Sequence, residues 1–302
     1  MGIIHQLTSQ SHLIYKKADE IVKIHLSVID QFWKLFASIF AVFLATISIF
    51  PIYVLLNSAV RPYADVVGDP LQPAFLEELT WENFIYAWQE GGFDQYVFNS
   101  VFIVVTSVIA IILICSLAAY ALMYMDVPHS KKWVMFLFAG FLLPSQVLFV
   151  PLFLMMNEIG MINRYPSLII VYIGFGISFS VFFFYQFYQT VPHTYREAAK
   201  IDGASEISIF LRIYFPLSLP VVYTIAIVQF VWLWNEFLYA LTFLTSDEKR
   251  TLPAGLVSFQ SVHLTDWASL TAGVVIAVIP TVIIFLLFQK YFIRGFTGGR
   301  VE

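Results

Sequence analysis

The chain has 302 residues, of which 60% are hydrophobic and 12% are charged, and its formal net charge is −4. Soluble domains carry about 25% charged residues, so this composition excludes a soluble globular protein and predicts a membrane protein with several spans. The single cysteine, Cys115, excludes an intrachain disulfide and a metal site built from several thiolates, and indicates a small buried apolar residue.

The first 34 residues form an extension ahead of the apolar part of the chain. They carry four lysines and lack a clean apolar stretch, which excludes a signal peptide. Two interpretations stay open: Ile14–Phe36 forms an amphipathic helix on the inner membrane surface, or the extension is poorly ordered. We therefore expect residues 1–34 to be a cytoplasmic extension and residues 35–302 to be the membrane domain.

Six windows without a charged residue follow, and each exceeds the roughly 20 apolar residues that a membrane helix needs. They predict an all-α fold of six transmembrane helices, at Phe36–Ser58, Val97–Tyr124, Trp133–Met156, Ser167–Gln189, Leu219–Leu241 and Leu270–Ile293. In the acidic segment 61–94, Thr80 is a good N-cap for a short helix. Pro144 and Pro151 predict a kink in the third membrane helix, and Pro280 interrupts the hydrogen-bond ladder of the sixth.

Lysine and arginine are distributed unequally between the two sides of these six helices. Twelve lie on the side of the amino terminus and four lie on the opposite side. Because short cytoplasmic loops of membrane proteins are rich in lysine and arginine, this bias predicts that both termini and the loop 190–218 are cytoplasmic.

The loop 190–218 is polar and helix-prone, although it joins two long apolar runs. One face of a short helix in it holds four residues, Tyr195, Ala198, Ala199 and Asp202. The two alanines would leave the backbone open to close approach by another surface. Gly203 predicts that the helix ends in the left-handed conformation, and Ser205 predicts a cap for the next helix. The helix is then either a contact for a soluble partner or an ordinary helix-forming stretch of a surface loop.

The same loop, EAAKIDGASEISIFLRIYFPLSLP, resembles the Glu-Ala-Ala loop of ATP-binding-cassette importer permeases. The match lies at Glu197, Ala198, Ala199, Asp202, Gly203 and Ala204, and continues at Ile213, Pro216, Leu217 and Pro220. Further segments are similar to the carbohydrate branch and above all to the second membrane subunit of maltose-type importers, namely TWENF, FNS, AAYALM, WNEFLYAL, TLPAGL and GFTGGRVE. The resemblance covers the chain from near residue 80 to its end.

This resemblance implies a type I importer permease fold in which Glu197–Ala204 belong to a coupling helix seated on a separate ATPase subunit. It implies a second permease subunit, two ATP-binding-cassette ATPases, and an extracellular solute-binding protein that delivers a sugar. ATP and Mg²⁺ would be bound by the ATPase, so we expect no cofactor, no catalytic residue and no enzymatic activity in this chain. The expected location is the lipid of the cytoplasmic (inner) membrane of a bacterium or archaeon.

Polar residues within the fifth predicted helix indicate a translocation path or gate. Glu236 and Asn235 lie in its outer third, and Gln229 lies two turns away, where it would line the same face. A charged residue at the centre of a membrane helix costs about 2.5–3.5 kcal/mol, so it usually faces a wet cavity or a partner. The alternative is a structural hydrogen bond to a neighbouring helix.

Three rival functions fit fewer of these features. An importer of the same fold could carry a peptide, an amino acid or a polyamine, but WNEFL and TLPAGL favour a carbohydrate. A secondary transporter would need several coupling-ion carboxylates at mid-membrane, and Glu236 is the one acidic residue within a span. A membrane enzyme or a metal site would need converging ligands, and the six histidines are scattered. A basic patch for nucleic acid is missing from the sequence.

Overall fold

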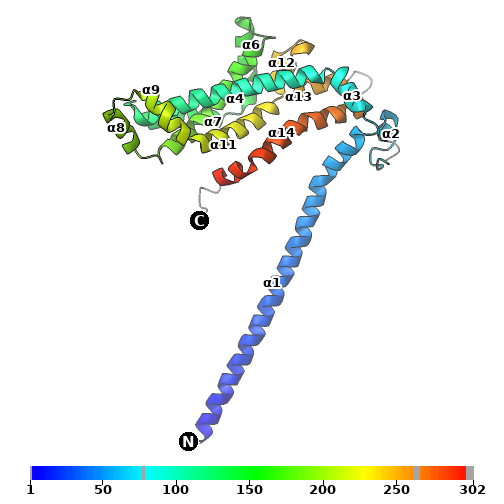
Figure 1. Ribbon diagram of the computed structural model, residues 1–302. Helices are drawn as coiled ribbons and strands as arrows, with labels where there is room; N and C mark the ends of the chain where they lie inside the picture. The colour runs from blue at the N-terminus through cyan, green and yellow to red at the C-terminus, as the bar shows by residue number, and fades with distance from the viewer. Residues whose placement is uncertain (1, 76–78, 261–265, 297–302) are drawn as a thin grey trace. The chain divides into compact units, whose positions relative to one another are not determined.

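The computed structural model describes residues 2–75, 79–260 and 266–296, with side chains from residue 30 to residue 288 within these ranges. Every element in the described residues is a helix (Figure 1). The chain divides into two units, Met1–Asn57 and Ser58–Glu302. The predicted all-α fold is therefore confirmed.

Four helices are long and apolar enough to cross a membrane. They are α1 (Gly2–Ala59) over its part Asp30–Ala59, α4 (Phe93–Tyr124), α7 (Tyr165–Tyr188) and α14 (Trp267–Phe296) over Trp267–Phe288. Two bent helix pairs pass the same test, Ser130–Phe141 with Ser145–Glu158 at 88° and Glu206–Leu217 with Leu219–Trp234 at 73°. If each pair is one span, the described residues hold up to six spans, each overlapping one of the six uncharged windows.

The first unit is a single helix. α1 runs without interruption through residue 34, where the extension was expected to end, and through Pro51 to Ala59. Of the two interpretations of the extension, the structure has a helix, over a longer range than Ile14–Phe36. The extension and the first candidate span are thus one continuous element.

The second unit is built around α4 and α7, which pack closely along their length. Gly176 of α7 lies against Ile111 of α4, and a Cβ atom on Gly176 would be 2.3 Å from the Ile111 Cδ1 atom. Cys115 is fully buried in the same core, as predicted. α11 (Leu219–Trp234) packs on α4, α7 and α14, and α5 (Ser130–Phe141) packs on α7. This arrangement positions both of the sites described below.

The third predicted helix is broken at Pro144, as expected. After α5, a 3-10 turn at Ser145–Leu148 leads into α6 (Phe149–Glu158). Pro151 does not add a second kink, because it is the third residue of α6, where its missing N–H would have no partner inside the helix. Pro280 removes one N–H from the ladder of α14, and that helix continues through it.

The fifth predicted helix, Leu219–Leu241, is not continuous, and this corrects the prediction. α11 ends at Trp234, residues 235–237 are not helical, and α12 begins at Leu238 and ends at Phe243. The break is stabilised by Glu236, whose carboxylate accepts the N–H groups of Tyr239 and Ala240 at 2.9 and 3.0 Å. Free N–H groups at a helix start attract a carboxylate, so Glu236 favours a new helix over a continued one.

Shorter helices form two connections, one between α1 and α4 and the other between α12 and α14. They are α2 (Tyr63–Gly68), α3 (Glu82–Gln89), α13 (Leu252–Gly255) and the 3-10 turns Asp247–Lys249 and Leu256–Phe259. The Thr80 hydroxyl accepts the Glu82 N–H at 3.1 Å, but the N-cap residue of α3 is Trp81, so the prediction misplaced the cap by one residue. Asn99 of α4 donates to the carbonyls of Glu248 and Arg250, both at 2.9 Å, and so fixes the second connection to α4.

Candidate functional site

The loop between α7 and α11 contains the predicted short helix as α8 (Thr194–Ile201) (Figure 1). Gly203 follows with φ +78°, so its left-handed conformation is confirmed. The Ser205 hydroxyl accepts the Ser208 N–H at 3.3 Å and caps α9 (Glu206–Ile209), as predicted. A π-helical turn at Phe210–Tyr214 and α10 (Phe215–Leu217) complete the connection to α11.

The two alanines of α8 face different surroundings, which corrects the interpretation that both lie open. Ala198 is exposed, together with Glu197 and Asp202, whereas Ala199 is half-buried and packs against the core. Ala204 is half-buried in the same way. The small methyl group of Ala199 lets α8 pack closely against the core. The surface that stays open to a partner is therefore the one that carries Glu197 and Ala198.

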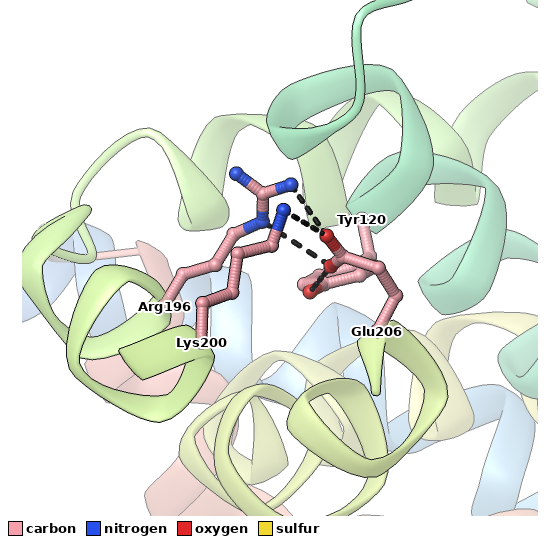
Figure 2. Close-up of polar contacts among 4 residues, drawn as sticks. All are labelled: Tyr120, Arg196, Lys200 and Glu206. Carbon is pink, nitrogen blue, oxygen red and sulfur yellow. Dashed lines mark hydrogen bonds and ion pairs between the residues drawn. The ribbon is translucent and has the colours of Figure 1, made fainter. Parts of the chain in front are cut away.

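A cluster of polar side chains that the sequence did not predict lies beside α8 (Figure 2). The Glu206 carboxylate accepts from Arg196 at 2.5 and 3.2 Å, from Lys200 at 2.8 Å and from the Tyr120 hydroxyl at 2.7 Å. The hydrogen bond to Glu206 raises the pKa of the Arg196 guanidinium, which keeps the pair fully ionised. One sequence pattern could have indicated this cluster: Arg196 and Lys200 are four residues apart on α8, and Glu206 follows the turn at Gly203.

A cavity of about 330 Å³ lies among α5, α7, α11 and α12 and holds two of the three predicted path residues. Its lining residues are Gly140, Phe141, Leu143, Ser145, Tyr172, Phe175, Ser178, Gln229, Trp232, Leu233, Glu236 and Tyr239. Glu236 and Gln229 share this cavity, as their spacing predicted. Asn235 does not line it: its side chain is exposed and donates to the Val231 carbonyl of its own helix at 2.7 Å.

Glu236 is both a lining residue and a structural hydrogen-bond acceptor, so it combines the two interpretations made from the sequence. Besides the N–H groups at the start of α12, it accepts from the Tyr172 hydroxyl of α7 at 2.8 Å. Gln229 is buried and donates to the Ser180 hydroxyl at 3.1 Å. The Tyr239 hydroxyl donates at 2.7 Å to the Ser145 carbonyl, in the 3-10 turn that follows the break at Pro144.

The lining of the cavity combines aromatic rings with hydrogen-bonding groups. Phe141 and Trp232 stack with centroids 5.6 Å apart and an interplanar angle of 17°, so the wall offers flat apolar faces. Serine, tyrosine, glutamine and glutamate side chains supply hydrogen-bonding groups, and none of the lining residues is lysine, arginine or histidine. In the part of the chain that the structure describes, no three histidine, cysteine or acidic side chains converge to hold a metal ion.

Comparison with known proteins gives consistent matches. Residues 125–298 match the family described as binding-protein-dependent transport system inner membrane component. The arabinooligosaccharides transport system permease protein AraQ of Halalkalibacterium halodurans is 34% identical over 262 residues, which are 86% of this chain and 93% of that protein. The trehalose/maltose transport system permease protein MalG of Thermococcus litoralis is 32% identical and covers 87% and 94% of the two chains. The diacetylchitobiose uptake system permease protein NgcG of Streptomyces coelicolor is 30% identical and covers 82% of each.

A solved structure has the same fold. A chain from the crystal structure of a bacterial transporter involved in the import of the acidic polysaccharide alginate aligns with a TM-score of 0.76, at 20% identity. The alignment covers 87% of this chain and 97% of that chain. The resemblance to carbohydrate importer permeases that the sequence indicated is therefore confirmed, as is the fold that it implied.

Proposed function

The chain belongs to the family of binding-protein-dependent transport system inner membrane components and is a permease of an ATP-binding-cassette importer, and from this premise we propose that it imports a sugar or oligosaccharide. The relatives named above carry arabinooligosaccharides, trehalose or maltose, and diacetylchitobiose, which supports a carbohydrate over a peptide or an amino acid. The family is one of transport permeases and not of enzymes.

The single observation that carries the mechanism is α8, a short polar helix with an exposed Glu197–Ala198 surface between two candidate spans. We propose that this surface, with Asp202, Gly203 and Ala204 shaping its end, docks on a separate ATPase subunit that binds ATP and Mg²⁺. Nucleotide-driven movement of the ATPase would then push α8 and rearrange the helices above it. The twelve-to-four bias of basic residues supports a cytoplasmic position for α8 and for both termini.

The cavity that contains Glu236 and Gln229 is proposed as the part of the translocation path that this chain supplies. Ring faces at Phe141 and Trp232 suit the apolar face of a sugar, and the hydrogen-bonding groups suit its hydroxyls. Glu236 is the one acidic residue among the lining residues, and a carboxylate repels a uronic acid. We therefore propose a neutral sugar as cargo, passed on by an extracellular solute-binding protein and enclosed with a second permease subunit.

Co-purification tests the docking surface. Ala198→Trp places a bulky side chain at an exposed position, so the second permease should still pair with this chain while the ATPase subunits are lost. Overpacking a tight contact costs about 1–3 kcal/mol, enough to weaken binding roughly five- to 150-fold. Thr194→Ala, at the exposed start of the same helix, is the control and should retain the ATPase. Full retention of the ATPase by Ala198→Trp would contradict docking at this surface.

Uptake competition tests the cargo. An excess of a neutral oligosaccharide should suppress uptake of the labelled neutral sugar, and a uronide of the same length should not. A polyamine serves as the third competitor, because a carboxylate beside aromatic rings also suits a cation. Uptake of the polyamine in place of the sugar would contradict the carbohydrate assignment and leave the docking surface standing.

A further inference from the structure

Glu206 occupies a position that the docking surface alone does not explain. It is the first residue of α9, only a quarter of its side chain is exposed, and its carboxylate reaches Tyr120 of α4. Its carboxylate joins two elements that are far apart in the sequence: Arg196 and Lys200 of α8 on one side, and Tyr120 of α4 on the other. Figure 2 shows the other three side chains meeting at the Glu206 carboxylate.

The contacts on the α4 side are rigid. Tyr120 lies one turn before the end of α4, and its ring is almost fully buried. Its hydroxyl donates to Glu206 at 2.7 Å, and its ring packs on Tyr214 and Phe210 at centroid distances of 5.1 and 5.4 Å. Both rings belong to the π-helical turn that follows α9, so one tyrosine holds the α9 segment by a polar contact and by two aromatic contacts.

The contacts on the α8 side are ionic and forked. Arg196 presents two nitrogens to the two oxygens of Glu206, a geometry that fixes direction as well as distance. Lys200 adds a third cationic contact one turn further along α8. Both cations lie before the glycine turn and Glu206 lies after it, so the carboxylate also closes the turn at Gly203.

From this geometry we propose that Glu206 is a positioning residue that fastens α8 to the end of α4, so that a displacement of α8 moves that membrane helix. The inference rests on the proposed function and adds a separate element to it. Ala198 and Glu197 contact the ATPase, whereas Glu206, Arg196 and Tyr120 pass the motion on. Without the fastening, α8 would pivot at the turn and the ATPase would hydrolyse ATP without moving the spans.

The test uses the complete importer in proteoliposomes, with three quantities measured for each variant: ATPase subunits retained, ATP hydrolysed, and sugar imported per ATP. Glu206→Ala and Tyr120→Phe should retain the ATPase and continue to hydrolyse ATP. Sugar imported per ATP should fall about tenfold or more in Glu206→Ala, because a hydrogen bond to a charged group is lost. Tyr120→Phe keeps the ring and removes the hydroxyl, so its fall should be smaller. Combining the two changes should add little, because both break the same link.

The possible outcomes distinguish failure of the proposed role of Glu206 from failure of the proposed transport function. Wild-type sugar import per ATP in both variants would overturn the fastening role while leaving the docking surface intact. Loss of the ATPase from Glu206→Ala with unchanged import per ATP in Tyr120→Phe would also overturn it, since Glu206 would then only shape the docking surface. Absence of ATP-driven import by the wild-type complex would refute the proposed function itself.

Discussion

Glu236 accepts three structural hydrogen bonds and lines the cavity, and Glu236→Ala removes both contributions. Glu236→Ala leaves the buried Tyr172 hydroxyl and two N–H groups of α12 without their acceptor. An unpaired buried polar group costs about 1–3 kcal/mol, so the variant should unfold at a lower temperature in detergent and import sugar more slowly. Asn235→Ala is the control, because Asn235 bonds only its own helix and lies outside the cavity. Equal uptake by Glu236→Ala and the wild type would remove Glu236 from the path.

Gly203 is constrained by its backbone and not by its neighbours. It has φ +78°, and a Cβ atom built on it would meet nothing within 4 Å. Gly203→Ala should therefore cost only the left-handed penalty of about 1–2 kcal/mol, and Gly203→Val should cost more because a β-branched residue is rare there. The expected result is graded loss of ATPase retention from alanine to valine. Equal and complete retention in both variants would show that the turn does not orient α8.

Single residues also show which features can be predicted from the sequence. The cap at Ser205 and the glycine turn at Gly203 follow from rules that act within three or four residues, so they were predictable. The link between Tyr120 and Glu206 spans 86 positions, and no local pattern indicates it. The different surroundings of Ala198 and Ala199 depend on which side of α8 packs on the core. The spacing of residues along α8 does not determine that side.

At the scale of elements, the contact between α4 and α7 should be sensitive to a single methyl group. Gly176→Ala places a Cβ atom 2.3 Å from Ile111 Cδ1, so the side chain or the helix must shift. Overpacking of this kind costs about 1–3 kcal/mol. Gly174→Ala is the matched control on the same helix, because nothing lies within 4 Å of its added methyl. Thermal unfolding in detergent should show a lower midpoint for Gly176→Ala only, and equal midpoints would contradict the close packing.

The orientation of the spans is a second prediction at this scale. Single cysteines at Ser205 and Gln72, in a Cys115→Ala background, lie at exposed positions in the two kinds of loop. A membrane-impermeant thiol reagent should label the Ser205→Cys variant only after the cells are opened, and the Gln72→Cys variant in intact cells. Labelling of the first variant in intact cells would contradict a cytoplasmic α8 and the coupling mechanism with it.

The broken fifth span shows why elements are harder to predict than spans. Charge-free windows depend on composition alone, and four of them overlap a single long helix while the other two overlap a bent helix pair. The sequence WLWNEFLYAL is continuously apolar around Asn235 and Glu236, so hydropathy predicts one helix. The break arises because the Glu236 carboxylate finds N–H groups at the start of α12 and a hydroxyl on α7. The hydroxyl is that of Tyr172, a tertiary contact that cannot be predicted from the sequence of α11 alone.

For the whole molecule, we propose that the chain moves sugar only when another subunit supplies the energy. In this proposal the exposed surface of α8 receives the movement of the ATPase and Glu206 fastens α8 to α4. The cavity with Glu236 lies among helices that pack on α4 and α7. Each part can be tested separately, because loss of ATPase docking, of motion passed to α4 and of sugar passage through the cavity would appear in different measurements.

The most direct measurement is uptake of a labelled neutral oligosaccharide by proteoliposomes that contain the complete importer and ATP. The wild-type chain should accumulate sugar against its gradient only when ATP and the solute-binding protein are both present. Ala198→Trp should abolish this accumulation while Thr194→Ala preserves it. Accumulation without ATP, or undiminished ATP-driven accumulation with Ala198→Trp, would contradict the claim that a separate ATPase drives this permease through α8.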